Sequence, residues 1–194
     1  MTKTISVVYH SGYGHTAKVA NAVADGAKST GANVEVHAID AEGNLSDAAW
    51  SKLDSSDAII MGTPTYMGGP SWQFKKYADT TSKRWFTLAW KNKIAAGFTT
   101  SGGMSDDKLA TLQQIHVLSM QHGMIWVGQA ESAPMLDGTH LASIDDVNRI
   151  GSYSGLMTQS NHKSGPDIAP PAGDIETAKR FGKRIAEITS KFTL

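Results

Sequence analysis

Glycine, serine and threonine gather in three short segments, and each segment directly follows a run of apolar residues. If those runs are neighbouring strands of one open α/β sheet, their carboxyl ends meet at the edge where ligands bind. We therefore expect the three segments to form a single binding site. Its candidate residues are Ser11, Gly12, Tyr13, Gly14, His15, Thr16, Pro64, Thr65, Tyr66, Met67, Gly68, Thr100, Ser101, Gly102 and Gly103.

The first segment, Ser11–Thr16, leads straight into a predicted helix and could bind an anion. Free backbone N–H groups and the helix dipole favour negative charge at a helix N-terminus. Gly12 and Gly14 allow the backbone to approach the anion closely, and three hydroxyl side chains add donors. We expect His15, beside the anion, to hydrogen-bond it as well.

Two kinds of anion compete for this segment. The sequence Gly12–Ala17 matches the dinucleotide fingerprint G-x-G-x-x-A, and Asp40 follows at the end of the next strand, which would indicate a Rossmann domain that binds NAD. Several hydroxyls instead suit a terminal phosphate, which has more oxygens to satisfy than a bridging pyrophosphate. The other two segments bear on this choice.

The second and third segments suit a flat heterocycle. In Pro64–Gly68, the proline fixes the chain, and Tyr66 and Met67 offer an aromatic edge beside backbone polar groups. The third segment, Thr100–Gly103, would add donors along the rim of the ring. The alternative for the second segment is a rigid turn in which Tyr66 and Met67 serve as packing residues.

Composition limits the chemistry available to the chain. Its 194 residues include no cysteine, which excludes thiolate nucleophiles, Cys-based zinc sites, iron–sulfur clusters and dithiol redox chemistry. Redox chemistry would therefore need a cofactor. The seven histidines lack the spacings of a metal-ligand set, so we predict no metal site.

Charge and hydropathy bear on partners and location. The 18 Lys and Arg residues balance 18 Asp and Glu residues, which argues against a nucleic-acid partner. No apolar stretch approaches the ~18 residues of a membrane span, and Met1–Tyr9 is unlike a signal peptide. We expect a cytoplasmic protein that does not bind membranes.

Apolar runs alternate with helical patterns along the chain. We predict strands over residues 5–9, 34–39, 57–62, 94–98 and 124–127, and helices containing residues 20–27, 71–83, 106–122 and 175–192. We expect Gly62 and Pro64 to end the third strand. The alternation predicts a single α/β domain over residues 1–194: a doubly wound five-stranded parallel sheet between two helical layers.

The pattern breaks between Gln129 and Gly173 into a long segment that contains Gly, Ser and Pro. A loop of that length in a compact domain is usually functional or an interface. A wandering surface insertion would look the same, and the sequence leaves both interpretations open.

Taken together, the three segments resemble the flavodoxin-like superfamily, and most closely the WrbA-type FMN-dependent NAD(P)H:quinone oxidoreductases. These have a phosphate loop like Ser11–Thr16, a flavin loop of the form Pro-Thr-x-aromatic-Gly like Pro64–Gly68, and a Thr/Ser/Gly-rich third loop. The likeness extends over nearly the whole chain. It includes Trp85, His122–Met124 and Gly151–Gly155.

The resemblance implies a flavodoxin-like fold with non-covalently bound FMN, its phosphate on Ser11–Thr16 and its ring against Pro64–Gly68 and Thr100–Gly103. It implies NAD(P)H as electron donor and a quinone or related small molecule as acceptor. The flavin would perform the chemistry, so no catalytic side chain is expected. Tyr13 and Trp85 would be the walls of the substrate pocket. It also implies a homo-oligomer, a tetramer or dimer, whose subunits complete one another's sites.

A flavodoxin that carries electrons between proteins is the alternative to an enzyme. Such carriers tend to be strongly acidic, because they dock through complementary charge. The zero net charge and the long Gln129–Gly173 segment favour the enzyme.

Overall fold

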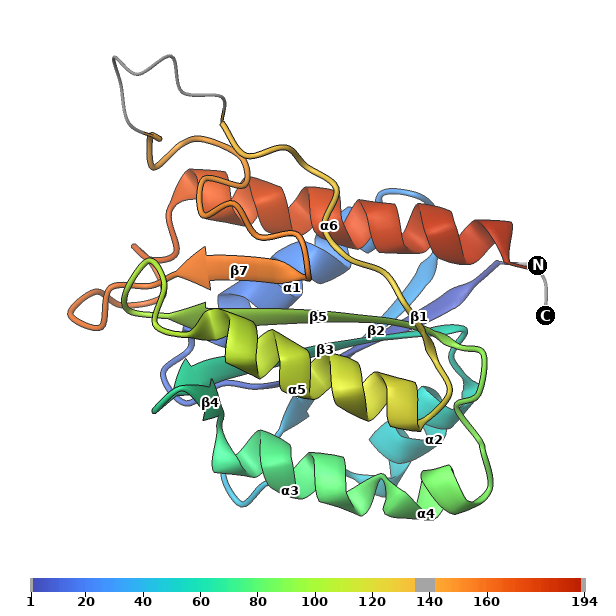
Figure 1. The fold of residues 1–194 in the computed structure, drawn as a ribbon. Helices are drawn as coiled ribbons and strands as arrows, with labels where there is room; N and C mark the ends of the chain where they lie inside the picture. The colour runs from blue at the N-terminus through green and yellow to red at the C-terminus, as the bar shows by residue number, and fades with distance from the viewer. Residues whose placement is uncertain (1, 135–141, 193–194) are drawn as a thin grey trace.

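Parallel strands at the centre of the molecule lie in the order β2-β1-β3-β5-β6, with helices on both faces (Figure 1). The computed structural model describes residues 2–134 and 142–192. Its strands are β1 (Thr4–His10), β2 (Asn33–Ile39), β3 (Ala58–Tyr66), β4 (Gly69–Pro70), β5 (Ile94–Ser101), β6 (Ile125–Trp126) and β7 (Leu156–Gln159). Its helices are α1 (His15–Lys28), α2 (Asp47–Ser55), α3 (Trp72–Thr80), α4 (Ser82–Phe86), α5 (Lys108–Gln121) and α6 (Ala172–Lys191).

Two hydrophobic clusters cover opposite faces of the sheet. The first cluster contains Val23 of α1 and Phe181 of α6 together with strand residues such as Val7. The second cluster contains Trp50 of α2 and Tyr77 of α3 together with Val8, the residue that follows Val7 in β1. Because successive side chains of a strand point to opposite faces, one strand serves both layers. The expected three-layer α/β fold is confirmed.

Two glycines let α1 and α6 pack against each other at very short range. A Cβ atom on Gly26 would lie 1.8 Å from the carbonyl oxygen of Lys179, and one on Gly182 would lie 1.9 Å from that of Val23. Real Cβ atoms do not approach backbone so closely. The two backbones therefore touch at these positions, which fixes α1, whose N-terminus faces the binding site.

The third and fourth strands extend further than predicted. β3 continues through Pro64 to Tyr66, and β5 runs to Ser101, so our prediction that Gly62 and Pro64 end the strand was wrong. The pairing of β3 with β1 stops at Gly62, whereas its pairing with β5 continues to Pro64. A proline is tolerated there because that side of β3 no longer needs a donor for a neighbour.

The fifth strand position is shared by two short strands. β6 pairs with the beginning of β5, and β7 pairs with its end, from Phe98–Leu156 to Ser101–Gln159. β7 lies inside the segment Gln129–Gly173, which we had read as one loop; residues 135–141 of that segment lie outside the described residues. α2 was also not predicted, although Ser46 caps it by accepting a hydrogen bond from the N–H of Ala49.

None of the helices in the described part of the chain is both long enough and apolar enough to cross a bilayer.

Candidate functional site

A cavity of about 750 Å³ opens at the carboxyl edge of the sheet, at the ends of β1, β3 and β5. All three predicted segments contribute to its wall, together with a fourth segment that follows β7. The lining residues are Tyr13, His15, Thr16, Pro64, Thr65, Tyr66, Thr100, Ser101, Gly102, Ser160, His162, Lys163, Ser164 and Gly165. Ser11, Gly12, Gly14, Met67, Gly68 and Gly103 lie next to these residues in the chain but do not line the cavity.

The first segment presents the N-terminus of α1 to the cavity. Gly14 adopts a left-handed conformation with φ +88°, and α1 begins at the next residue. Ser11 lies beneath the loop, where its Oγ accepts hydrogen bonds from the N–H groups of Gly14 (3.1 Å) and Ala17 (3.2 Å). The first N–H groups of a helix have no acceptor inside it. Those of His15 and Thr16 are therefore free to bind an anion.

The first and second segments touch through tyrosines. The rings of Tyr13 and Tyr66 meet edge to face with centroids 6.2 Å apart. A Cβ atom on Gly12 would lie 2.5 Å from the Tyr66 hydroxyl, so a larger residue there would displace that side chain. Met67, at φ 48°, is fully exposed in the turn between β3 and β4.

Hydroxyl groups fix the second segment to its neighbours. Thr65 Oγ1 lies 2.8 Å from Thr99 Oγ1 on β5 and 2.8 Å from Thr111 Oγ1 on α5. At the start of α3, Ser71 Oγ lies 2.8 Å from Nδ1 of the buried His10. Burial lowers the pKa of His10 and so favours the neutral form of this ring at the end of β1.

A buried lysine supports the third segment. Lys108, only 1% exposed, donates from Nζ to Ser101 Oγ (2.7 Å) and to the Gly103 carbonyl oxygen (2.6 Å). Burial lowers the pKa of Lys108 to about 8, although the carboxylates of Asp106 and Asp174 act in the opposite direction. The Asp106 carboxylate also accepts from the N–H of Gly103.

The fourth segment, Ser160–Gly165, was not predicted as part of the site. Its first residue is fixed to the third segment: the Ser160 N–H donates to the Ser101 carbonyl (2.8 Å), and the Ser160 and Thr100 hydroxyls lie 3.0 Å apart. Near its other end, His15 Nε2 lies 2.8 Å from the Ser164 carbonyl oxygen. The segment therefore spans the cavity from the third loop to the first.

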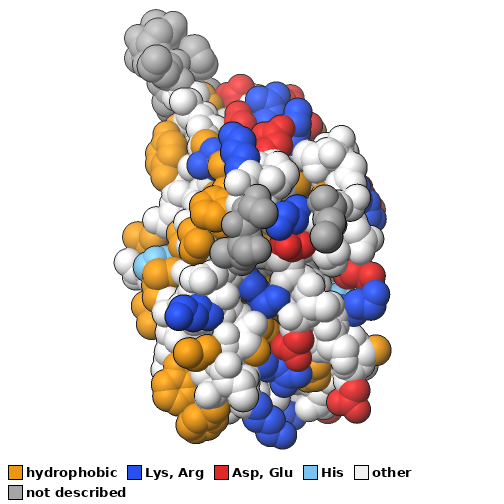
Figure 2. All heavy atoms as spheres, turned by 90° about the vertical axis from the view of Figure 1, so that its right-hand side faces the viewer, with side chains coloured by type: hydrophobic (Ala, Val, Ile, Leu, Met, Phe, Trp, Pro, Cys, Tyr) orange, Lys and Arg blue, Asp and Glu red, His pale blue; other side chains and the backbone are white. Residues whose placement is uncertain are grey.

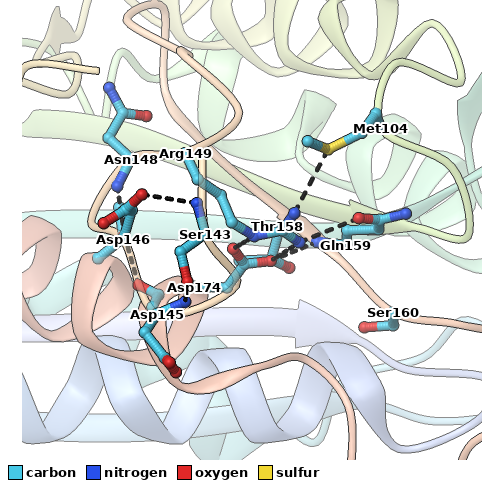
Figure 3. A network of polar contacts seen from close by, with 12 residues as sticks. Met104, Ser143, Asp145, Asp146, Asn148, Arg149, Thr158, Gln159, Ser160 and Asp174 are labelled. Carbon is cyan, nitrogen blue, oxygen red and sulfur yellow. Dashed lines mark hydrogen bonds and ion pairs between the residues drawn. The ribbon is translucent and has the colours of Figure 1, made fainter. Parts of the chain in front are cut away.

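An ion pair in the interior holds β7 and the third loop in register (Figure 3). Arg149 Nε donates to Asp174 Oδ1 at 2.7 Å, and both side chains are almost fully buried. Gln159 joins them: its N–H donates to Asp174 Oδ2 (2.7 Å), its Oε1 accepts from Arg149 (3.0 Å), and its Nε2 donates to the Gly102 carbonyl (3.0 Å). Burial raises the pKa of Asp174 despite these partners.

Trp85 lies on a different hollow from the rest of the predicted site. It lines a groove of about 590 Å³ formed by α3, α4 and α5, whose wall also includes Phe74, Val117 and Leu118. Tyr13 does line the loop cavity and is 76% exposed there. Within one chain, the structure thus places the two proposed substrate residues in separate cavities.

Residues 9–134 match the family described as NADPH-dependent FMN reductase, which covers more than half of the chain. The chain belongs to this family. The matched range contains the first three segments of the cavity and ends before the fourth. The FMN cofactor and the flavodoxin-like fold expected from the sequence are confirmed.

Some relatives of this FMN reductase family member are named flavodoxins, and others are named NAD(P)H dehydrogenases (quinone). The flavodoxin FldP of Pseudomonas aeruginosa is 44% identical over 188 residues, 97% of each chain. An NAD(P)H dehydrogenase (quinone) of Archaeoglobus fulgidus is 32% identical, over 96% of this chain and 97% of its own. Among solved structures, the flavodoxin, WrbA-like protein from Agrobacterium tumefaciens is 44% identical, with a TM-score of 0.76 over 98% of this chain and 99% of its own.

The cavity fits FMN in the chemistry of its donors. The N-terminus of α1 provides unpaired N–H groups at one end, where a phosphate is recognised. Towards the other end, Thr65, Thr100 and Ser101 bring side-chain hydroxyls, and the ring of Tyr66 lies beside them. A phosphate ester of a flat polar ring system matches both ends.

Proposed function

We propose that this protein is an oxidoreductase that uses FMN to pass electrons from NAD(P)H to a quinone or a related small acceptor. When bound, FMN would supply the redox chemistry, which is hydride transfer from the nucleotide and transfer of two electrons to the acceptor. The protein binds and orients the reactants and controls the access of water.

The observation that best supports this proposal is that the three predicted segments and the fourth segment line one open cavity. Exposed aromatic side chains also line it. Tyr13 and Tyr66, 76% and 39% exposed, stand where a second flat molecule can stack or slide past. Ser11–Thr16 would hold the phosphate, and Pro64–Gly68 with Thr100–Gly103 would hold the ring. Relatives named NAD(P)H dehydrogenase (quinone) support the proposed reaction.

A carrier that moves electrons between proteins is the second candidate, because the 44% identical relative is named a flavodoxin. Charge argues against it. The 18 basic residues balance the 18 acidic ones, and on the face shown in Figure 2 the two signs are interspersed rather than gathered into an acidic docking patch.

We further propose that the protein acts as a homo-oligomer. Exposed hydrophobic side chains, including Trp85, Phe86, Leu88, Val117 and Met120, lie on or beside α4 and α5. Figure 2 shows hydrophobic side chains gathered along one side of the molecule. A second subunit on this surface would bury Trp85 and could bring it to a neighbouring cavity, as the proposed substrate role of Trp85 requires.

The test is a set of anaerobic spectra of the FMN-loaded protein. NADH or NADPH should bleach the flavin absorbance, and a benzoquinone added afterwards should restore it. A flavin that dithionite reduces but neither nucleotide reduces would indicate the carrier. A protein that takes up no FMN would refute both candidates.

A further inference from the structure

The charges on the cavity wall are all of one kind. No Asp or Glu is among the described residues that line it, and its three basic residues are His15, His162 and Lys163. Two of the three belong to the fourth segment, and His15 is hydrogen-bonded to that segment. Lys163, which carries a formal positive charge, therefore lies on the segment that contacts the start of α1.

The first segment cannot neutralise a phosphate ester by itself. Ser11–Thr16 contains neither Lys nor Arg. A helix N-terminus contributes the equivalent of about half a positive charge, whereas a phosphate monoester carries about −1.5 to −2 at pH 7. A charge deficit of about one unit or more remains.

His15 is committed to another contact. A carbonyl oxygen can only accept, so the 2.8 Å contact requires His15 Nε2 to donate to Ser164. The Nε2 atom of His15 therefore holds the fourth segment rather than the anion, and the contact between His15 and the anion stays a prediction.

Lys163 has an ammonium group without a charged partner. No ion pair or side-chain hydrogen bond involves its Nζ among residues 2–134 and 142–192. Its backbone, by contrast, is fixed: its N–H donates to Asn161 Oδ1 (3.0 Å), and the N–H of Ser164 donates to the Asn161 carbonyl (3.0 Å). Lys163 lines the cavity, and a backbone that is ordered before the ligand arrives reduces the entropy lost on binding.

The far side of the fourth segment is also fastened to α1. A Cβ atom on Gly14 would lie 3.0 Å from Pro166 Cγ, so the phosphate loop and the chain after the fourth segment are in contact. Lys18 Nζ donates to the carbonyl oxygens of Asp167 (3.4 Å) and Pro170 (3.2 Å). These contacts fasten the chain that follows Lys163 to α1 and to the loop before it.

We propose that Ser160–Gly165 is a fourth wall of the FMN site and that the Lys163 ammonium group is the counter-charge of the FMN phosphate. The assignment rests on the proposed use of this cavity by FMN. It gives the chain a phosphate contact outside the range that matches the family.

The test compares FMN with riboflavin, which has the same ring and ribityl chain but no phosphate. Dissociation constants are measured by quenching of flavin fluorescence with the full chain after its flavin has been removed. Lys163→Met should weaken FMN binding about tenfold, or about 1.4 kcal/mol, and leave riboflavin binding unchanged. Lys163→Arg should retain most of the FMN affinity. The control Lys83→Met, at an exposed position on α4, should change neither.

Two outcomes contradict the proposal, and a third contradicts the proposed function instead. Equal losses for FMN and riboflavin would mean that Lys163 only supports the fold of the segment. An unchanged FMN constant would mean that Lys163 does not meet the phosphate. In that case the dissociation constants of NADPH and NADH are measured for the same variant, and weaker binding of NADPH alone would assign Lys163 to the nucleotide's extra phosphate. A wild-type chain that binds neither flavin would instead refute the proposed function.

Discussion

Replacing Lys108 by Met should change how the stability of the protein depends on pH. Lys108 is almost completely buried, and burial lowers its pKa from 10.5 to about 8. Between those values the unfolded chain holds a proton that the folded chain has released, so the stability of the wild type rises with pH. The shift corresponds to about 3 kcal/mol at 1.36 kcal/mol per pKa unit.

The variant has no ammonium group at this position and lacks this contribution. Its stability at neutral pH reflects two opposing effects: the relief of a buried charge, and the loss of donors to Ser101 and Gly103. The difference in pH dependence is free of that ambiguity. Between about pH 7 and about pH 9.5, the wild type should gain about 2 kcal/mol relative to Lys108→Met.

Urea denaturation at a series of pH values measures this difference directly. The control Lys83→Met removes an exposed lysine and should follow the wild type throughout. Parallel curves for the wild type and Lys108→Met would refute the reasoning, because they would mean that Lys108 keeps an ordinary pKa in the folded state.

Further predictions concern packing, the interior ion pair and the phosphate loop. Gly182→Ala should lower the free energy of unfolding by about 1–3 kcal/mol, since a methyl group would force α1 and α6 apart; urea denaturation measures it, and an unchanged midpoint would contradict the close contact. Arg149→Met should lower the free energy of unfolding by about 3–5 kcal/mol in the same assay, because it removes the cation that pairs with the buried Asp174 carboxylate. A loss below about 1 kcal/mol would contradict this and would show that the carboxylate finds other partners. Thr16→Glu should abolish FMN retention by placing an anion against the phosphate, while Thr30→Glu, at the exposed end beyond α1, should not; equal retention, with circular dichroism unchanged, would mean that the loop is misassigned.

The sequence predicted the elements whose signals are local. β1 is a short apolar run that ends at a Ser/Gly cluster, and Val19 and Val23 continue the apolar stripe of α1 on its buried face. The three loops were placed together because parallel strands end at one edge, and the structure brings residues of all three into one cavity.

The fourth segment could not be found in this way, because its position depends on tertiary pairing. β7 has only four residues, Leu156–Gln159, and becomes a strand by pairing with the end of β5. The signals that fix it are a buried Arg149–Asp174 pair and Gln159, which come together only in the fold. A polar run such as Ser160–Gly165 has no periodicity that would distinguish it from a surface loop.

The helix α2 was missed for a different reason, since its signal was present. Ser46 precedes the helix as an N-cap, and Ala49, Trp50 and Leu53 form its buried face. Nine residues give only a short stretch of periodicity. The cap was the better indicator.

The most direct test of the account is the rate at which NAD(P)H reduces the bound flavin under nitrogen, measured by stopped-flow absorbance and compared with the turnover number for quinone reduction. If the bound flavin carries the electrons, one of the two nucleotides should bleach it at least as fast as the enzyme turns over. Bleaching far slower than turnover would contradict it, as would a flavin that only dithionite reduces.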